Sequence, residues 1–143
     1  MNYSQKFENN DLDGWDNPQA SPRILKDGHN HYIAPAKLEV DTSLFFYKTF
    51  TPAVPPGTLI EMKFKIKVPE GEKVTQLACG LMKTTTRVDF PNMPKSDGKW
   101  HEYEGKFTAD ASDANIFFIS ATHENAQMKD IETGVDEIFI TST

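Results

Sequence analysis

The stretch LIEMKFKIKV, residues 59–68, alternates between apolar and polar side chains over its whole length. Successive side chains of a β-strand point to opposite faces, so this pattern predicts a strand with one buried and one solvated face. Strands of this half-buried kind are typical of antiparallel sheets. The predicted buried face consists of Ile60, Met62, Phe64, Ile66 and Val68.

Similar short segments occur along the rest of the chain, whereas no segment of any length has the 3.6-residue apolar spacing of a helix. Turn-forming sequences such as VPPG (54–57) and DASDAN (110–115) separate them. About nine short strands at this spacing predict an all-β fold, a β-sandwich of two antiparallel sheets with about 8–10 strands. The further strands are expected at 5–8, 36–41, 44–51, 74–82, 85–90, 100–108, 115–122 and 135–142.

Length and composition narrow the class of protein. A chain of 143 residues fits one domain spanning 1–143. Its net charge of -6 argues against a nucleic-acid partner, which would need a basic face. No apolar run approaches the length of a membrane span, and the N-terminal residues lack the pattern of a signal peptide. The single cysteine, Cys79, lies in an apolar segment, and we expect it to be a buried small hydrophobe.

The sequence gives little support for enzymatic activity. Carboxylates are plentiful, but most fall on the polar side of predicted strands, as solvated side chains do. A glycosidase would need two of them flanking one bond. No serine elbow, Cys–His pair, HExxH motif or glycine-rich phosphate loop stands out. We therefore expect a protein that binds rather than one that catalyses.

Four segments follow one another along the chain: KFENNDLDGW (6–15), VPPGTLIEMKFKIKV (54–68), DGKWHEYEGKFTADASDANIFFIS (97–120) and GVDEIFITST (134–143). In this order they resemble the jelly-roll carbohydrate-binding modules of the group containing families 4, 9, 16 and 22, within the galactose-binding-like β-sandwiches. The resemblance covers nearly the whole chain. One departure is the segment DGHNHYIAPAK (27–37), which stands where these modules usually have His-Ser-Gly before the third strand.

The resemblance implies a non-catalytic module that binds a polysaccharide of β-glucan or xylan type in a groove on the concave sheet. Such a module holds an attached glycoside hydrolase near its substrate. It also implies a monomer that is tethered to a catalytic domain. The parent protein would be secreted, so the module would be extracellular or at the cell surface. Neither nucleic acid nor a membrane is expected as a partner. Fold does not fix function, so a spacer or protein-interaction module without a glycan ligand stays open. Outward-facing rings at Phe45 and Tyr47 would favour glycan binding, and core-facing rings would favour the spacer.

Sugar recognition combines an aromatic platform for the C–H face of a pyranose with polar side chains for its hydroxyls. Alternation places Phe45 and Tyr47 on one face of their strand, and Arg87 and Asp89 on one face of theirs. For Arg87 and Asp89 the alternative is a solvated ion pair. Phe46, Phe64, Phe107 and Phe118 are expected in the core. The candidate carbohydrate-binding residues are Phe45, Tyr47, Arg87, Asp89, His123, Glu124, Gln127 and Tyr32.

The resemblance also implies a structural Ca²⁺ where the first and last strands meet. Glu8 matches the Phe-Glu position of the family, and Asp136 matches the Asp of the closing strand. Two converging carboxylates repel each other unless a cation lies between them, and calcium takes oxygen ligands. The alternative is that both carboxylates face solvent separately. The candidate ligands are Glu8, Asn10, Lys26, Asp27 and Asp136.

Overall fold

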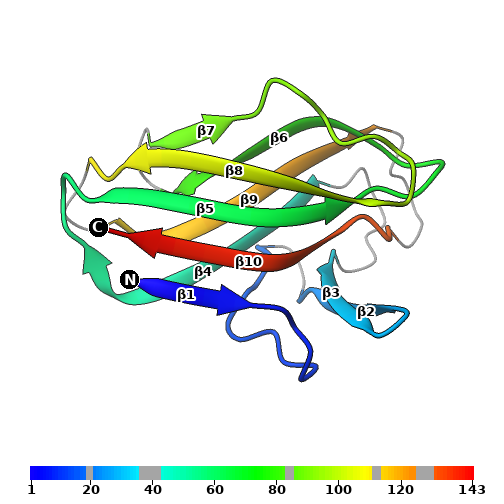
Figure 1. Cartoon of the computed structure of the whole chain (residues 1–143), viewed down its shortest axis with the longest axis horizontal. Helices are drawn as coiled ribbons and strands as arrows, with labels where there is room; N and C mark the ends of the chain where they lie inside the picture. Colours follow the sequence, from blue (N-terminus) through cyan, green and yellow to red (C-terminus); the bar gives the residue numbers. More distant parts are fainter. Residues whose placement is uncertain (19–20, 36–42, 83–85, 111–113, 125–130) are drawn as a thin grey trace.

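The computed structural model describes residues 1–18, 21–35, 43–82, 86–110, 114–124 and 131–143. Two antiparallel sheets pack face to face (Figure 1). Sheet A contains β1 (Asn2–Gln5), β2 (Arg23–Asp27), β3 (Asn30–Ala34), β5 (Leu59–Lys67), β8 (Trp100–Thr108) and β10 (Gly134–Ser142). Sheet B contains β4 (Ser43–Val54), β6 (Lys73–Leu81), β7 (Arg87–Asp89) and β9 (Ala114–Glu124). The predicted all-β sandwich is confirmed.

The strand order explains how distant parts of the chain meet. Sheet A runs β2-β3-β10-β5-β8, with β1 also paired to β10, and sheet B runs β4-β9-β6-β7. The first and last strands therefore lie side by side, as Figure 1 shows. The described residues form no helix, and so none that is long and apolar enough to cross a membrane.

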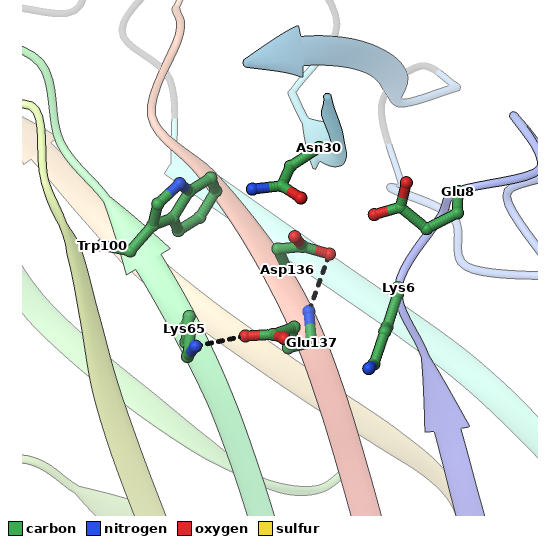
Figure 2. A pocket seen from close by; sticks show the side chains of 7 residues that line it. All are labelled: Lys6, Glu8, Asn30, Lys65, Trp100, Asp136 and Glu137. Carbon is green, nitrogen blue, oxygen red and sulfur yellow. Dashed lines mark hydrogen bonds and ion pairs between the residues drawn. The ribbon is translucent and has the colours of Figure 1, made fainter. Parts of the chain in front are cut away.

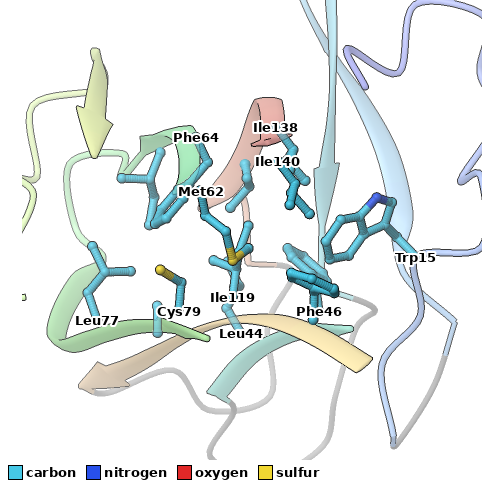
Figure 3. Packing of buried hydrophobic residues seen from close by; sticks show 14 of the residues in the cluster. Trp15, Leu44, Phe46, Met62, Phe64, Leu77, Cys79, Ile119, Ile138 and Ile140 are labelled. Atoms are coloured by element: carbon cyan, nitrogen blue, oxygen red, sulfur yellow. The ribbon is translucent and has the colours of Figure 1, made fainter. Parts of the chain in front are cut away.

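The core lies between the two sheets and is built by the alternation that the sequence predicted. Ile60, Met62, Phe64 and Ile66 of β5 are fully buried, whereas the intervening residues are partly exposed. Figure 3 shows Met62 and Phe64 facing Cys79 and Leu77 of sheet B. Burying one such large apolar side chain contributes about 1.5–3 kcal/mol. Burial also raises the pKa of the Cys79 thiol to about 12, which keeps it protonated and unreactive.

Two details of the strand prediction need correction. The first strand ends at Gln5 and does not run over 5–8, because the Gln5 side chain accepts hydrogen bonds from the backbone N–H groups of Lys6 and Phe7. Phe7 then adopts a φ of 56°, which turns the chain. No strand was expected on either side of Gly28, where β2 and β3 form a hairpin with Gly28 at its tip. The strand expected at 36–41 lies outside the described residues.

The outer faces of the two sheets differ in character. On sheet A, Lys63 lies 3.3 Å from a carboxylate oxygen of Glu61 and 3.7 Å from one of Glu104. Lys106 lies 3.4 Å from Glu104 on the same face. This surface carries a network of exposed ion pairs. Such pairs contribute little to stability and are typical of a solvated face. The outer face of sheet B carries a group of neighbouring aromatic rings, and a candidate site lies there.

Candidate functional site

Phe45 and Tyr47 project from the outer face of sheet B. Their neighbours Leu44 and Phe46 are fully buried between the sheets, whereas both rings are only partly buried and lie outside the core. The alternation of β4 thus turns two adjacent aromatic side chains outward. This is the arrangement expected for a glycan platform rather than for a spacer.

The register of sheet B aligns the candidate residues in two rows that cross all four strands. Neighbouring strands are about 4.8 Å apart, so each row extends about 14 Å. The first row is Tyr47, Phe118, Gly80 and Arg87, in the order β4, β9, β6, β7. The second row, in the same order, is Phe45, Ser120, Ala78 and Asp89.

Phe118 belongs to this face, although it was expected in the core. Its ring is stacked on that of Phe45, with centroids 5.6 Å apart and planes inclined by 7°. Phe45 in turn lies 6.4 Å from Tyr47 at an angle of 50°. Phe118 is only 6% exposed because Phe45 and Arg87 cover it, not because it packs between the sheets. Alternation along β9 turns Phe118 to the side opposite the buried Phe117, and therefore away from the core.

Arg87 and Asp89 provide the polar end of the rows. Nη2 and Nε of Arg87 donate to Oδ1 of Asp89 at 2.7 and 3.2 Å. The guanidinium carbon lies 5.8 Å from the ring centroid of Phe118. Both side chains are at least half exposed, so the pair adds little to folding stability. It does present a planar donor and a carboxylate acceptor beside the aromatic platform.

The other residues expected at this site are placed differently. His123 follows the core-facing series of β9 and is only 7% exposed, so it does not join the outer face. Glu124 ends β9 opposite Lys73, and its side chain lies outside the described residues, as does Gln127.

Tyr32 lies on the other sheet, in β3. Its ring is 3% exposed, its hydroxyl donates to the carbonyl of Glu132 at 3.2 Å, and Trp100 packs edge-on at 5.2 Å. The Nζ atom of Lys67 lies 4.6 Å from the ring centroid. These contacts make Tyr32 a packing residue, and it cannot line the same surface as Phe45.

A second candidate site is a cavity of about 380 Å³ where β1 ends beside β10. Figure 2 shows the carboxylates of Glu8 and Asp136 and the amide of Asn30 directed toward the same space. Lys65, which also borders the cavity, is ion-paired with Glu137. The residues that line it are Lys6, Glu8, Asn30, Lys65, Trp100, Asp136 and Glu137.

A break in the β10 ladder places Asp136 in this cavity. The register with β5 shifts after Asp136, and Glu137 has a φ of 50°, as in a β-bulge that redirects a side chain. Asp136 is only 6% exposed. Burial, together with the negative charges of Glu137 and Glu8, raises the pKa of its carboxyl to about 6. A bound cation would stabilise the ionised carboxylate of Asp136 and offset its repulsion from Glu137 and Glu8.

The remaining candidate calcium ligands do not line this cavity. Asn10 and Lys26 are exposed elsewhere. Oδ2 of Asp27 accepts hydrogen bonds from Lys67 at 3.0 Å and from the Trp100 indole at 3.2 Å, and the lysine holds the pKa of Asp27 below its usual value. Among the described residues no three His, Cys, Asp or Glu side chains form a metal-binding group. A calcium ion here would therefore draw on two carboxylates together with amide, carbonyl or water oxygens, a set that calcium accepts.

Comparison of the sequence with models of known families and with curated proteins finds no match. Among solved structures, the chain is similar to xylanase 10B of Clostridium thermocellum, whose CBM22-1 and GH10 modules were determined with xylohexaose. The TM-score is 0.61 and the identity 15%, over 97% of this chain and 28% of the xylanase chain. The chain thus spans little more than a quarter of that protein.

Two further similar structures are isolated modules. One is TmCBM27, described as a module for specific mannan recognition, with a TM-score of 0.51 and 9% identity over 100% of this chain and 96% of the module. The other is a family 16 carbohydrate-binding module, with a TM-score of 0.51 and 18% identity over 92% of this chain and 93% of the module. The fold is therefore that of the jelly-roll carbohydrate-binding modules, as the four sequence segments indicated.

Proposed function

We propose that this protein is a non-catalytic module that binds a neutral polysaccharide, of β-glucan or xylan type, across the outer face of sheet B. The observation that carries the proposal is the outward pair Phe45 and Tyr47, placed on a sheet whose other face forms the core. The similar structures support it, because one of them was determined with xylohexaose and another recognises mannan.

The chemistry of the two rows suits a sugar chain. The C–H face of a pyranose packs against an aromatic ring, and its hydroxyls take hydrogen bonds in the plane of the ring. Phe45 and Tyr47 supply the platform, while Arg87 and Asp89 supply a donor and an acceptor about 14 Å away across the sheet. This span accommodates several consecutive sugar units. Arg87 and Asp89 neutralise each other, which favours an uncharged chain.

In a longer protein, such a module raises the concentration of an attached glycoside hydrolase at its substrate. We place it in that role, as a monomer, in a secreted or cell-surface protein. Binding of a neutral polysaccharide at this face requires neither a basic surface nor a membrane. The exposed carboxylate of Asp89 is paired with Arg87, and the proposal includes no bond cleavage.

Affinity electrophoresis tests the proposal directly. The protein is run in native gels containing xylan, barley β-glucan, laminarin or galactomannan. We expect retardation by at least one of them, and its loss in Tyr47→Ala. The matched control is Phe139→Ala, which removes an exposed ring from the opposite sheet and should leave the retardation unchanged. Unaltered mobility in every gel would instead favour the spacer or protein-contact alternative.

We also propose a structural Ca²⁺ in the cavity between Glu8 and Asp136, with the Asn30 side chain as a further oxygen donor. The buried carboxylate of Asp136 and the negative charges around it support this choice. When bound, the ion would neutralise these charges and tie the end of β1 to β10 and to the β2–β3 hairpin. Its role would be to stabilise the fold, because the cavity lies on a different sheet from Phe45 and Tyr47.

A further inference from the structure

A second cavity, of about 350 Å³, opens beside the edge strand β7 and shares Asp89 with the outer face of sheet B. It has no counterpart among the residues that the sequence singled out, apart from Asp89 itself. Its walls combine polar and apolar side chains. The lining residues are Thr75, Gln76, Leu77, Asp89, Phe90, Pro91 and Met93.

A β-bulge in β6 forms the polar wall. Val74 pairs with His123 and Gln76 with Thr122, so Thr75 is an extra residue in β6. Val74 and Leu77 are both 2% exposed, whereas Thr75 and Gln76 between them are both exposed. A regular strand would turn only one of these two side chains outward. The bulge therefore directs two consecutive polar side chains to the outer face, as bulges next to binding sites often do.

Contacts with both sheets hold the apolar wall of the cavity in place. The Phe90 ring packs edge-on against Phe64 at 5.9 Å and against Tyr103 at 5.1 Å. The backbone N–H of Phe90 donates to the carbonyl of Leu77 at 2.9 Å, and the Tyr103 hydroxyl donates to the carbonyl of Asn92 at 3.0 Å. Phe90 and the residues after it are thus anchored to both sheets. The cavity is preformed, and a ligand entering it need not order this wall.

Asp89 connects the cavity to the rows. It ends the second row and also lines the cavity, and Gln76 lies on the neighbouring strand. A polysaccharide backbone lying on the rows would therefore bring its substituents to the cavity mouth.

We propose that this cavity binds a neutral monosaccharide branch of a polysaccharide whose backbone occupies the rows. The proposal rests on the function proposed above and narrows its ligand to a branched chain. The Gln76 amide and the Asp89 carboxylate offer hydrogen-bond partners for hydroxyls, and Pro91 and Met93 offer apolar contact for C–H groups. The residues that line the cavity include no lysine or arginine that could pair with a uronic acid, so an uncharged branch is expected.

The test compares linear and branched forms of one backbone by isothermal titration calorimetry. Suitable pairs are linear mannan oligosaccharides with galactosylated ones, and linear xylo-oligosaccharides with arabinosylated ones, with a glucuronate-bearing xylan fragment as a charged branch. For the backbone that binds, we expect the neutral branched form to bind about tenfold more tightly than the linear form. The glucuronate-bearing fragment should show no such gain.

A double variant, Thr75→Val with Gln76→Ala, should bring the ratio of branched to linear affinity to about one and leave the linear affinity unchanged. The control is Thr141→Val, an exposed threonine of sheet A, which should change neither value. A wild-type protein that binds linear chains as tightly as branched ones would overturn this inference and leave the proposed function standing. A double variant that loses both forms equally would do the same. Failure of every backbone to bind would overturn both.

Discussion

The guanidinium of Arg87 reaches the ring of Phe118 across Gly80, with 5.8 Å between the guanidinium carbon and the ring centroid. Gly80 pairs with Phe118 on one side and with Arg87 on the other, and it has no side chain to separate them. A cation over an aromatic face is attracted by the quadrupole of the ring. The arrangement fixes a polar group beside the stacked rings of Phe45 and Phe118 without burying it.

Replacing Arg87 by lysine should weaken glycan binding although the charge is kept. Lysine lacks the planar fork that donates to Asp89 while lying over Phe118. We expect a loss of about tenfold in affinity, measured by calorimetry, with the melting temperature unchanged because the pair is exposed. Lys99→Arg, an exposed exchange outside the face, is the control. Full affinity in Arg87→Lys would show that this side chain is only a solvated partner of Asp89.

A Gly80→Ala substitution should destabilise the protein through β7. A Cβ atom at this position would lie 2.5 Å from the carbonyl oxygen of Thr86 and 2.7 Å from the Cα of Arg87, and both are backbone atoms that cannot rotate away. We expect a loss of about 1–3 kcal/mol in the free energy of unfolding, measured in urea. Ser120→Ala, in the adjacent row of the same face, should cost far less. A fully stable Gly80→Ala protein would mean that β7 moves freely.

Calcium should raise the melting temperature, and a chelator should lower it, if the proposed ion is present. Asp136→Asn should abolish this response, because it removes the buried carboxylate of the cavity. Asp27→Asn should keep the response, since Asp27 does not line the cavity and its carboxylate accepts hydrogen bonds from Lys67 and Trp100. Equal melting temperatures with calcium and with chelator would refute the site, and loss of the response in Asp27→Asn would reinstate the ligand set expected from the sequence.

Acid should destabilise the protein through Asp13. Partial burial raises the pKa of this carboxyl, but hydrogen bonds from Tyr3 and Gln5 and the charge of Lys48 outweigh burial, so the pKa lies below its ordinary value of 3.8. For a lowered carboxyl pKa, the stabilisation is complete above the unfolded-state value and is lost as the pH falls through the folded-state value.

The measurement is the melting temperature of the wild type and of Asp13→Asn at pH 6 and pH 3. The difference between the two proteins should be large at pH 6 and smaller at pH 3. Glu70→Gln, an exposed carboxylate on a turn, should differ little from the wild type at either pH. A difference for Asp13→Asn that is the same at both pH values would show that the charge of this carboxylate does not matter.

Much of the fold followed from alternation alone. The pattern of 59–68 gave the faces of β5, and the same argument turned Phe45 and Tyr47 away from Leu44 and Phe46. Alternation was less informative for IFFIS (116–120), where both faces of the strand are apolar. Only the packing of sheet A against one of them decided that Phe117 is core and Phe118 is not.

Other parts of the sites depend on contacts that no local pattern contains. Glu8 and Asp136 share a cavity because β1 pairs with β10, and the resemblance to a known family was the only signal for it in the sequence. His123 was a candidate carbohydrate-binding residue, but it continues the buried face of β9. No sequence pattern predicted that Thr75 and Gln76 both face outward. A bulge depends on the register with the neighbouring strand and not on the residues themselves.

The sequence by itself determined that the chain forms short amphipathic strands, and which side chains of each strand share a face, because strand geometry has a fixed period of two. The tertiary structure alone decided which of two apolar faces is buried, where the period is interrupted, and which distant residues meet. Those outcomes depend on the pairing of strands far apart in the chain, and that pairing brought Tyr47, Phe118, Gly80 and Arg87 into one row.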